Sequence, residues 1–171
     1  MRASAVWMGT LLSLLTMRPA SAQVTAVAVA AGEHSVLRHH GDGGEVGAEV
    51  RFAPVRFAFM PRLVPDFIPV AGASRTSKGS VYGYGGFRLD FPMGRRLLTT
   101  IGFAAGNYHQ GDGKRLGGPV EFRSNIEIAM RLGAGSRLGL CLYHLSNAGL
   151  YEHNPGSESL VLAWTVGLGN R

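Results

Sequence analysis

Apolar and polar residues alternate with a period of two along most of the chain after residue 22, in stretches separated by clusters of Gly, Pro and Asp. This period matches a β-strand, whose successive side chains point to opposite faces. No segment after residue 22 combines helical periodicity with helix caps. The alternation therefore predicts an all-β chain with eight strands, at residues 23–37, 44–53, 55–70, 79–90, 96–107, 119–132, 137–147 and 157–168.

The connections between the expected strands alternate in length. Pro61, Pro65 and Pro69 would remove ladder donors from the third strand, which favours a shorter strand with a loop there. Short turns at one end and long loops at the other are typical of outer-membrane barrels, whose strands need about nine to eleven residues to span the bilayer. We therefore predict an eight-stranded antiparallel transmembrane (outer-membrane) β-barrel, with an interior filled by side chains rather than a pore. Short turns are expected at Pro54, 91–95 and 133–136, and longer polar loops at 38–43, 71–78, 108–118 and 148–156.

The composition excludes several classes of protein. With 46% hydrophobic and 16% charged residues, the chain is neither intrinsically disordered nor a polytopic helical membrane protein. Its single cysteine, Cys141, excludes an intramolecular disulfide framework and is expected to face the packed interior. The formal net charge of +6 is compatible with an anionic lipid surface, and no motif for binding nucleic acid is present.

The first residues are expected to be a secretory signal peptide rather than part of the fold. Arg2 gives a short basic start, residues 3–15 are mostly apolar, and residues 20–22 are small. Such a segment is too short to span a bilayer as a helix and is removed on export. We therefore expect a signal peptide at residues 1–22 and a single outer-membrane β-barrel domain at residues 23–171.

The last expected hairpin gathers polar side chains at the end of an apolar stripe. His144 and Ser146 are two positions apart on one strand, so their side chains project from the same face. If His144 pairs with Glu158 on the other strand, the leucines of both strands also fall on one face. The further pairs expected in this register are Leu142 with Leu160, Leu140 with Leu162, and Leu138 with Trp164.

A hydroxyl, an imidazole and a carboxylate in this order can act as nucleophile, general base and the group that orients the base. Ionisable side chains on a lipid-facing stripe are costly, which favours a functional reason for them. The alternative is that His144 and Ser146 only mark the interface where the strand leaves the hydrocarbon. With both ends of the barrel chain in the periplasm, the seventh strand ends at the outer leaflet, where the site would meet lipid A.

Four stretches of the chain carry a resemblance to a known family. They are HLSNAGLYEHNPGSE at residues 144–158 and the segments at residues 47–52, 82–86 and 116–124. In these stretches the chain resembles the lipid A 3-O-deacylase (PagL) family. The resemblance implies an eight-stranded barrel in the cell outer membrane of Gram-negative bacteria, with an active site toward the outer leaflet. It also implies hydrolysis of the ester-linked 3-hydroxyacyl chain at the 3-position of lipid A.

Carried over by position, the resemblance makes Ser146 the nucleophile that forms an acyl-enzyme. His144 becomes the general base and Glu158 the carboxylate that orients it. This chemistry needs no metal and no other cofactor. The implied partner is the lipid A or lipopolysaccharide of the outer leaflet, nucleic acid is not expected, and a homodimer is left open.

The resemblance also names candidates for the oxyanion hole and for binding substrate, which are Asn147, Gly149 and Asn154. Alternation turns Asn147 toward the interior, so the Gly149 amide and the Asn154 side chain are the favoured donors. Plain turn formation explains the sequence at residues 154–156 equally well.

Two functions of other classes stay open. A catalytically silent small outer-membrane barrel with a structural or adhesive role keeps the fold, but predicts that Ser146→Ala changes nothing measurable. A soluble periplasmic binding barrel would turn the apolar stripes inward. The spacing of His144, Ser146 and Glu158 argues against the first, and outward apolar stripes argue against the second.

Other polar residues are weaker candidates for a site. His39, His40 and Asp42 lie in a Gly-rich loop without a spaced partner, so a solvated loop is expected there rather than a metal site. Four basic residues in or near outward loops are candidates for contacts with the phosphates of lipid A, as an alternative to ordinary surface charge: Arg75, Lys114, Arg115 and Arg123.

Overall fold

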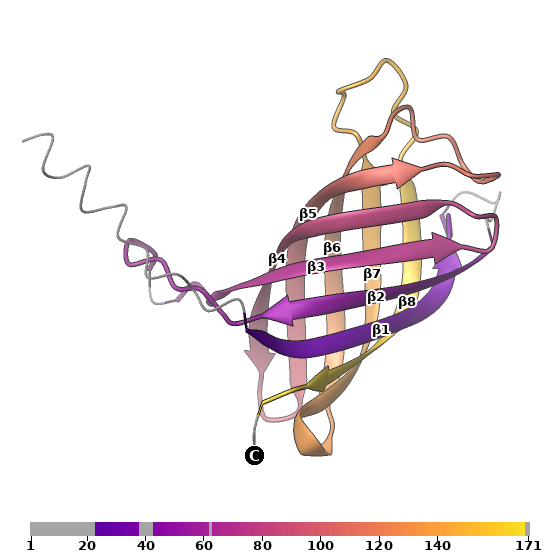
Figure 1. Cartoon of the computed structure of the whole chain (residues 1–171). Coiled ribbons are helices and arrows are strands. Elements are labelled where there is room, and N and C mark those ends of the chain that lie inside the picture. The colour runs from indigo at the N-terminus through magenta and orange to yellow at the C-terminus, as the bar shows by residue number, and fades with distance from the viewer. Residues whose placement is uncertain (1–22, 38–42, 62, 170–171) are drawn as a thin grey trace, which may run out of the picture.

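Eight antiparallel strands form a closed barrel, in which each strand pairs with its neighbours in the chain and the last pairs with the first (Figure 1). The computed structural model describes residues 23–37, 43–61 and 63–169, and the expected signal peptide lies outside them. The predicted eight-stranded barrel is confirmed, and no helix within these residues is long and apolar enough to cross a membrane. The strands are β1 (Val24–His34), β2 (Gly44–Phe52), β3 (Phe67–Thr76), β4 (Val81–Met93), β5 (Leu97–His109), β6 (Val120–Arg131), β7 (Ser136–Ser146) and β8 (Ser157–Gly167).

The third strand differs from the expectation. β3 spans Phe67–Thr76 instead of residues 55–70. Residues 53–66 connect β2 to β3. They contain Pro54, Pro61 and Pro65, which lack the N–H that a strand ladder requires. The turn from β3 to β4 needs only residues 77–80, so the long loop expected at residues 71–78 is wrong. The predicted alternation of short and long connections therefore fails on both sides of β3.

Alternation along each strand separates an outward apolar wall from a packed interior. On β7, Leu140 is 53% exposed whereas its neighbour Cys141 is 1% exposed, as predicted. A cavity inside the barrel has a volume of about 30 Å³, about the share of one water molecule, so this part of the interior offers no channel. The outward wall includes Val29, Ile101, Phe103, Ile128, Leu140, Leu162 and Trp164.

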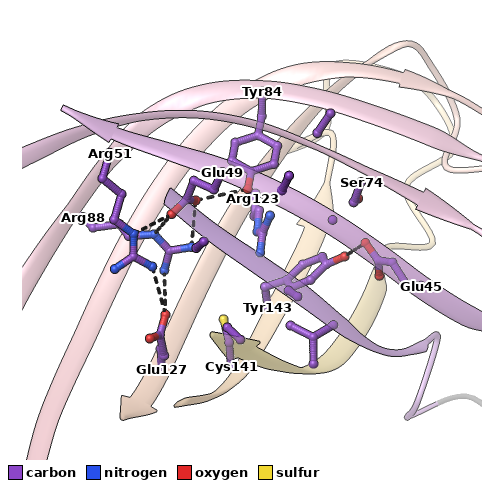
Figure 2. Close-up of a pocket in the computed structure, with 17 residues that line it drawn as sticks. Glu45, Glu49, Arg51, Ser74, Tyr84, Arg88, Arg123, Glu127, Cys141 and Tyr143 are labelled. Atoms are coloured by element: carbon purple, nitrogen blue, oxygen red, sulfur yellow. Dashed lines mark hydrogen bonds and ion pairs between the residues drawn. The ribbon is translucent and has the colours of Figure 1, made fainter. Parts of the chain in front are cut away.

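Four charged side chains inside the barrel, Glu49, Arg51, Arg88 and Glu127, contact one another (Figure 2). Glu49 Oε1 accepts hydrogen bonds from Arg51 Nε at 3.0 Å and from Arg88 Nε at 2.7 Å. Arg88 Nη1 also lies 3.3 Å from Glu127 Oε2. These contacts connect β2, β4 and β6 across the interior. Because a buried charge is tolerated only when it is paired, the network is a polar core that depends on all of its members.

Arg123 belongs to this interior and not to the outward loops. Its guanidinium lies 3.8 Å from the centre of the Tyr143 ring and 4.7 Å from that of Tyr84, and the residue is 6% exposed. The prediction that Arg123 contacts lipid A phosphates is therefore wrong, because alternation on β6 turns its side chain inward. Of the other basic candidates, Arg75 and Arg115 are exposed and Lys114 is half-buried.

Candidate active site

His144 and Glu158 face each other across the hairpin of β7 and β8. The two strands pair in the predicted register, with His144 opposite Glu158 and the leucine pairs in line behind them. Nδ1 of His144 lies 3.1 Å from Oε1 of Glu158. The His144 side chain is 44% exposed and that of Glu158 is 15% exposed. A largely covered carboxylate at this distance fixes the orientation of an imidazole ring.

Ser146 is the last residue of β7, two positions beyond His144. Both side chains therefore project from the outward face of the strand. On the neighbouring strand β6, Phe122 pairs with Ser146 and Ser124 pairs with His144. The strand geometry thus brings the three predicted residues to one end of the outer wall.

Gly156 limits the space at the other edge of the His144 ring. A Cβ atom at residue 156 would lie 2.7 Å from Cε1 and 3.3 Å from Nε2 of His144, and Gly156 has a φ of +61° that favours glycine. The last hairpin pair is Leu145 with Ser157, so the next position along the hairpin sets Gly156 beside Ser146. The ring nitrogen that does not contact Glu158 therefore lies at the Ser146 end of the site.

Asn147 ties the end of β7 to two connecting segments. Its side chain is fully buried, as alternation predicts. Nδ2 of Asn147 donates to the carbonyl oxygens of Leu116 at 2.9 Å and of His153 at 2.8 Å. One amide group thereby joins the β5–β6 and β7–β8 connections, at the end of the barrel opposite the C-terminal end of the chain (Figure 1).

The three oxyanion-hole candidates lie in one turn. The Asn147 amide donates to Oδ1 of Asn154 at 3.1 Å, and the Gly149 amide donates to Oδ1 of Asn147 at 3.0 Å. Ala148 and Gly149 both have positive φ, at 53° and 80°, which turns the chain sharply after Ser146. The Gly149 amide is thus engaged by Asn147, and the choice of donor that contacts substrate stays a prediction.

Two depressions in the outer wall meet at Ser124, a residue that sequence reasoning did not select. Ser124 could have been found by extending the alternation argument from β7 to β6, because it pairs directly with His144. The Ser146 depression, of about 210 Å³, is lined by Phe103, Phe122, Ser124, Ser146 and Ala148. The His144 depression, of about 320 Å³, is lined by Ser124, Asn125, Ile126, Leu142, Tyr143, His144 and Glu158.

The polar groups of the site suit nucleophilic and acid–base chemistry. Among the residues that the structure describes, no group of three or more His, Cys, Asp and Glu side chains is placed to hold a metal ion. The loop with His39, His40 and Asp42 lies outside those residues.

Fold and site together define a small β-barrel of the outer-membrane type, with Ser, His and Glu side chains gathered on its outer wall. The sequence profile described as "Lipid A 3-O-deacylase (PagL)" matches residues 71–166, which include His144, Ser146 and Glu158. The chain belongs to the lipid A 3-O-deacylase (PagL) family.

One relative is similar in sequence, and two solved structures share the fold. The lipid A deacylase PagL of Bordetella bronchiseptica is 30% identical over 79 residues, which are 46% of this chain and 40% of that protein. The crystal structure of the outer membrane enzyme PagL superposes with a TM-score of 0.63 at 19% identity, covering 82% of this chain and 98% of the other. A de novo designed transmembrane β-barrel superposes with a TM-score of 0.52 at 7% identity, covering 84% and 98%. The two structural matches support the barrel fold.

Proposed function

We propose that this chain is an outer-membrane serine esterase that hydrolyses the ester-linked 3-hydroxyacyl chain at the 3-position of lipid A. The observation that carries the proposal is the 3.1 Å contact between His144 and Glu158, beside Ser146 on an apolar outer wall. Family membership supports the substrate class, because the Bordetella bronchiseptica relative is named a lipid A deacylase. This residue set suits acyl transfer from an ester that lies in the membrane.

In the first step Ser146 Oγ attacks the ester carbonyl while His144 takes the hydroxyl proton. Glu158 stabilises the imidazolium that forms and keeps the ring nitrogen near Gly156 directed at the reacting atoms. The C–O bond to the sugar breaks, and His144 returns the proton to the leaving oxygen. The products are an acyl-enzyme on Ser146 and a free 3-hydroxyl on the sugar.

In the second step a water molecule replaces the sugar oxygen. His144 takes a proton from this water, which attacks the acyl carbonyl. The bond between the acyl carbon and Ser146 Oγ then breaks, His144 returns the proton to Oγ, and the fatty acid leaves. Both steps place negative charge on the carbonyl oxygen, which needs hydrogen-bond donors nearby. The connection that holds Asn147, Gly149 and Asn154 adjoins Ser146. The Asn154 side-chain amide is the proposed donor, because the backbone amides of Asn147 and Gly149 already donate to side-chain oxygens.

The position of the site on the outside of the barrel suits a substrate that stays in the leaflet. Ser146 ends β7 at the end of the barrel away from the C-terminal end of the chain (Figure 1). With the ends of the barrel chain in the periplasm, this end lies at the outer leaflet, where lipid A acyl chains would contact the apolar wall. The ester can then reach Ser146 without leaving the membrane.

Mass spectrometry of lipid A tests the proposal. Wild-type protein in micelles with lipid A should remove one 3-hydroxyacyl group from the 3-position, and Ser146→Ala should not. Ser124→Ala is the matched control, because Ser124 lies opposite His144 on β6 and lines both depressions but is not the proposed nucleophile, so this variant should still deacylate lipid A. Equal deacylation by wild type and Ser146→Ala would reject Ser146 as the nucleophile. Intact lipid A with a barrel shown to be folded by heat-modifiable gel migration would favour the catalytically silent barrel.

A further inference from the structure

A row of phenylalanine rings on the outer wall leads away from Ser146. The row consists of Phe122 on β6, Phe103 on β5, Phe87 on β4 and Phe67 on β3. We propose that this phenylalanine row binds the acyl chain that is transferred to Ser146, and that its extent determines which chain lengths are preferred. The inference rests on the proposed esterase function and adds a binding surface to it.

The rings follow one another without a gap that an acyl chain would have to cross. Ring centroids are 5.8 Å apart for Phe122 and Phe103, 6.5 Å for Phe103 and Phe87, and 5.1 Å for Phe87 and Phe67. Phe103 is 45% exposed, and the other three rings are half-buried. Aromatic rings partly open to lipid offer large apolar faces at fixed positions.

Small side chains lie beside this row. Ala105 pairs with Phe122, Gly85 pairs with Ala105, and Ala71 pairs with Gly85, at outward positions of three successive strands. Each of these residues is two positions from a ring of the row, or four on β3, so both sets face the same side of the wall. The side chains next to the rings therefore project only a short way from the barrel, and an extended acyl chain can lie against the ring edges.

The row begins at the proposed nucleophile. Ser146 pairs with Phe122, and the Ser146 depression is lined by Phe122 and Phe103. The His144 depression lies on the other side of Ser124 and holds His144 and Glu158. In acyl transfer the acyl carbon bonds to Ser146 Oγ, whereas the leaving oxygen must stay within reach of the proton on His144. The acyl chain is therefore assigned to the Ser146 depression and the sugar side of the ester to the His144 depression.

Chain-length dependence separates this role from a structural one. Phe103 lies near Ser146, so Phe103→Ala should lower kcat/KM about tenfold for esters of every chain length. Phe67 is the member of the row farthest along from Ser146, and the Phe57 ring follows it at 5.3 Å. Phe67→Ala should therefore lower kcat/KM about three- to tenfold for long chains and leave short chains unchanged. Leu162→Ala removes a side chain that is 52% exposed on β8, outside the row, and should leave kcat/KM unchanged for long and for short chains. If the ratio of kcat/KM for long-chain esters to kcat/KM for short-chain esters is the same in wild type, Phe67→Ala and Leu162→Ala, the assignment is overturned.

A labelling experiment tests binding of the acyl chain to the row without enzymatic turnover. Fatty esters with a photoreactive group at the chain end are added to the Ser146→Ala variant in micelles and irradiated, and labelled peptides are identified by mass spectrometry. A short chain should label the β5 segment with Phe103, and a long chain should label segments with Phe87 or Phe67. Labels spread evenly over the apolar wall would overturn the proposal that the row binds the acyl chain. Absence of ester hydrolysis by wild type would reject the proposed function instead, so the two failures are distinguishable.

Discussion

His144 is held at both edges of its ring, and the two contacts have different consequences. On one edge Glu158 is a charged partner at 3.1 Å, and on the other Gly156 leaves just enough space for the ring. The first contact affects the proton that His144 carries, whereas the second affects only where the ring lies. Variants at the two positions therefore separate electrostatics from placement.

Loss of the Glu158 charge should slow the reaction without abolishing it. Glu158→Gln keeps the shape but cannot stabilise an imidazolium, so kcat should fall by about 10²- to 10⁴-fold, less than the roughly 10⁶-fold loss in Ser146→Ala. KM should be nearly unchanged because Glu158 does not bond to substrate. Steady-state kinetics on a soluble ester in micelles measures both constants, and a Glu158→Gln enzyme as fast as wild type would exclude the orienting role.

A methyl group at residue 156 should displace the His144 ring. Gly156→Ala would place Cβ 2.7 Å from His144 Cε1, so kcat should fall at least about tenfold while the barrel still forms. Gly94→Ala is the matched control, because Gly94 also has a positive φ, 71°, but its Cβ would meet no atom within 4 Å. Equal activity of the two variants would show that the ring tolerates the added atom.

At the residue scale, sequence alone located the His144–Glu158 pair because one assumption, that both leucine stripes face the same way, fixes the register of the hairpin. Ser124 was missed because that reasoning stopped at a single hairpin. The close approach of Gly156 to the imidazole could not be predicted, since a glycine in a turn is expected for backbone reasons alone.

The connection between β7 and β8 is the element that positions the end of the site. Asn147 anchors it through the carbonyl groups of Leu116 and His153. A loop held by hydrogen bonds from a side-chain amide can be loosened without opening the barrel beneath it. The position of Ser146 therefore depends on a contact between two loops and not only on its strand.

Substitution of Asn147 should loosen this connection. Asn147→Asp retains an acceptor for the Gly149 amide but loses the two Nδ2 donors, which leaves two carbonyl groups without their partner. We expect a cost of about 1–3 kcal/mol, faster proteolysis within residues 148–156 and lower kcat. Limited proteolysis read by mass spectrometry measures the first effect. A cleavage pattern identical to wild type would contradict the anchoring role.

At the element scale the prediction failed at β3 for a physical reason. The segment before it is as apolar as a strand, but its prolines prevent continuous pairing. The true strand contains Ala71, Gly72 and Ala73, whose small side chains give almost no hydrophobic alternation to detect. Strong alternation on β7 and β8 made those strands predictable from the same argument.

The charged network inside the barrel connects three strands of the whole molecule. Glu49→Ala would remove one of the two carboxylates that Arg51 and Arg88 share in a buried site, and leave only Glu127 (Figure 2). We expect the barrel to lose about 3–5 kcal/mol of unfolding free energy, with activity per folded molecule unchanged. Glu33→Ala, at an exposed position of β1, should change the unfolding free energy by less than about 1 kcal/mol. Urea unfolding in lipid vesicles compares the variants, and equal midpoints would contradict the account of the interior.

For the whole molecule, strand number and closure were predictable because alternation repeats along the chain. The interior network was not, since inward polar positions such as Glu49 and Arg88 do not reveal from sequence which residues pair across the barrel. Arg123 was assigned to the surface for the same reason. Three-dimensional closure decides which charges meet.

Covalent labelling identifies the nucleophile of the barrel. An alkyl phosphonate ester that reacts with activated serine hydroxyls is added to wild type, Ser146→Ala and Ser124→Ala in micelles, and the modified residue is located by mass spectrometry. We expect one label on Ser146 in wild type and in Ser124→Ala, and none in Ser146→Ala. A label on Ser124, or a wild-type barrel that is folded and unlabelled, would contradict the assignment of Ser146 as the nucleophile.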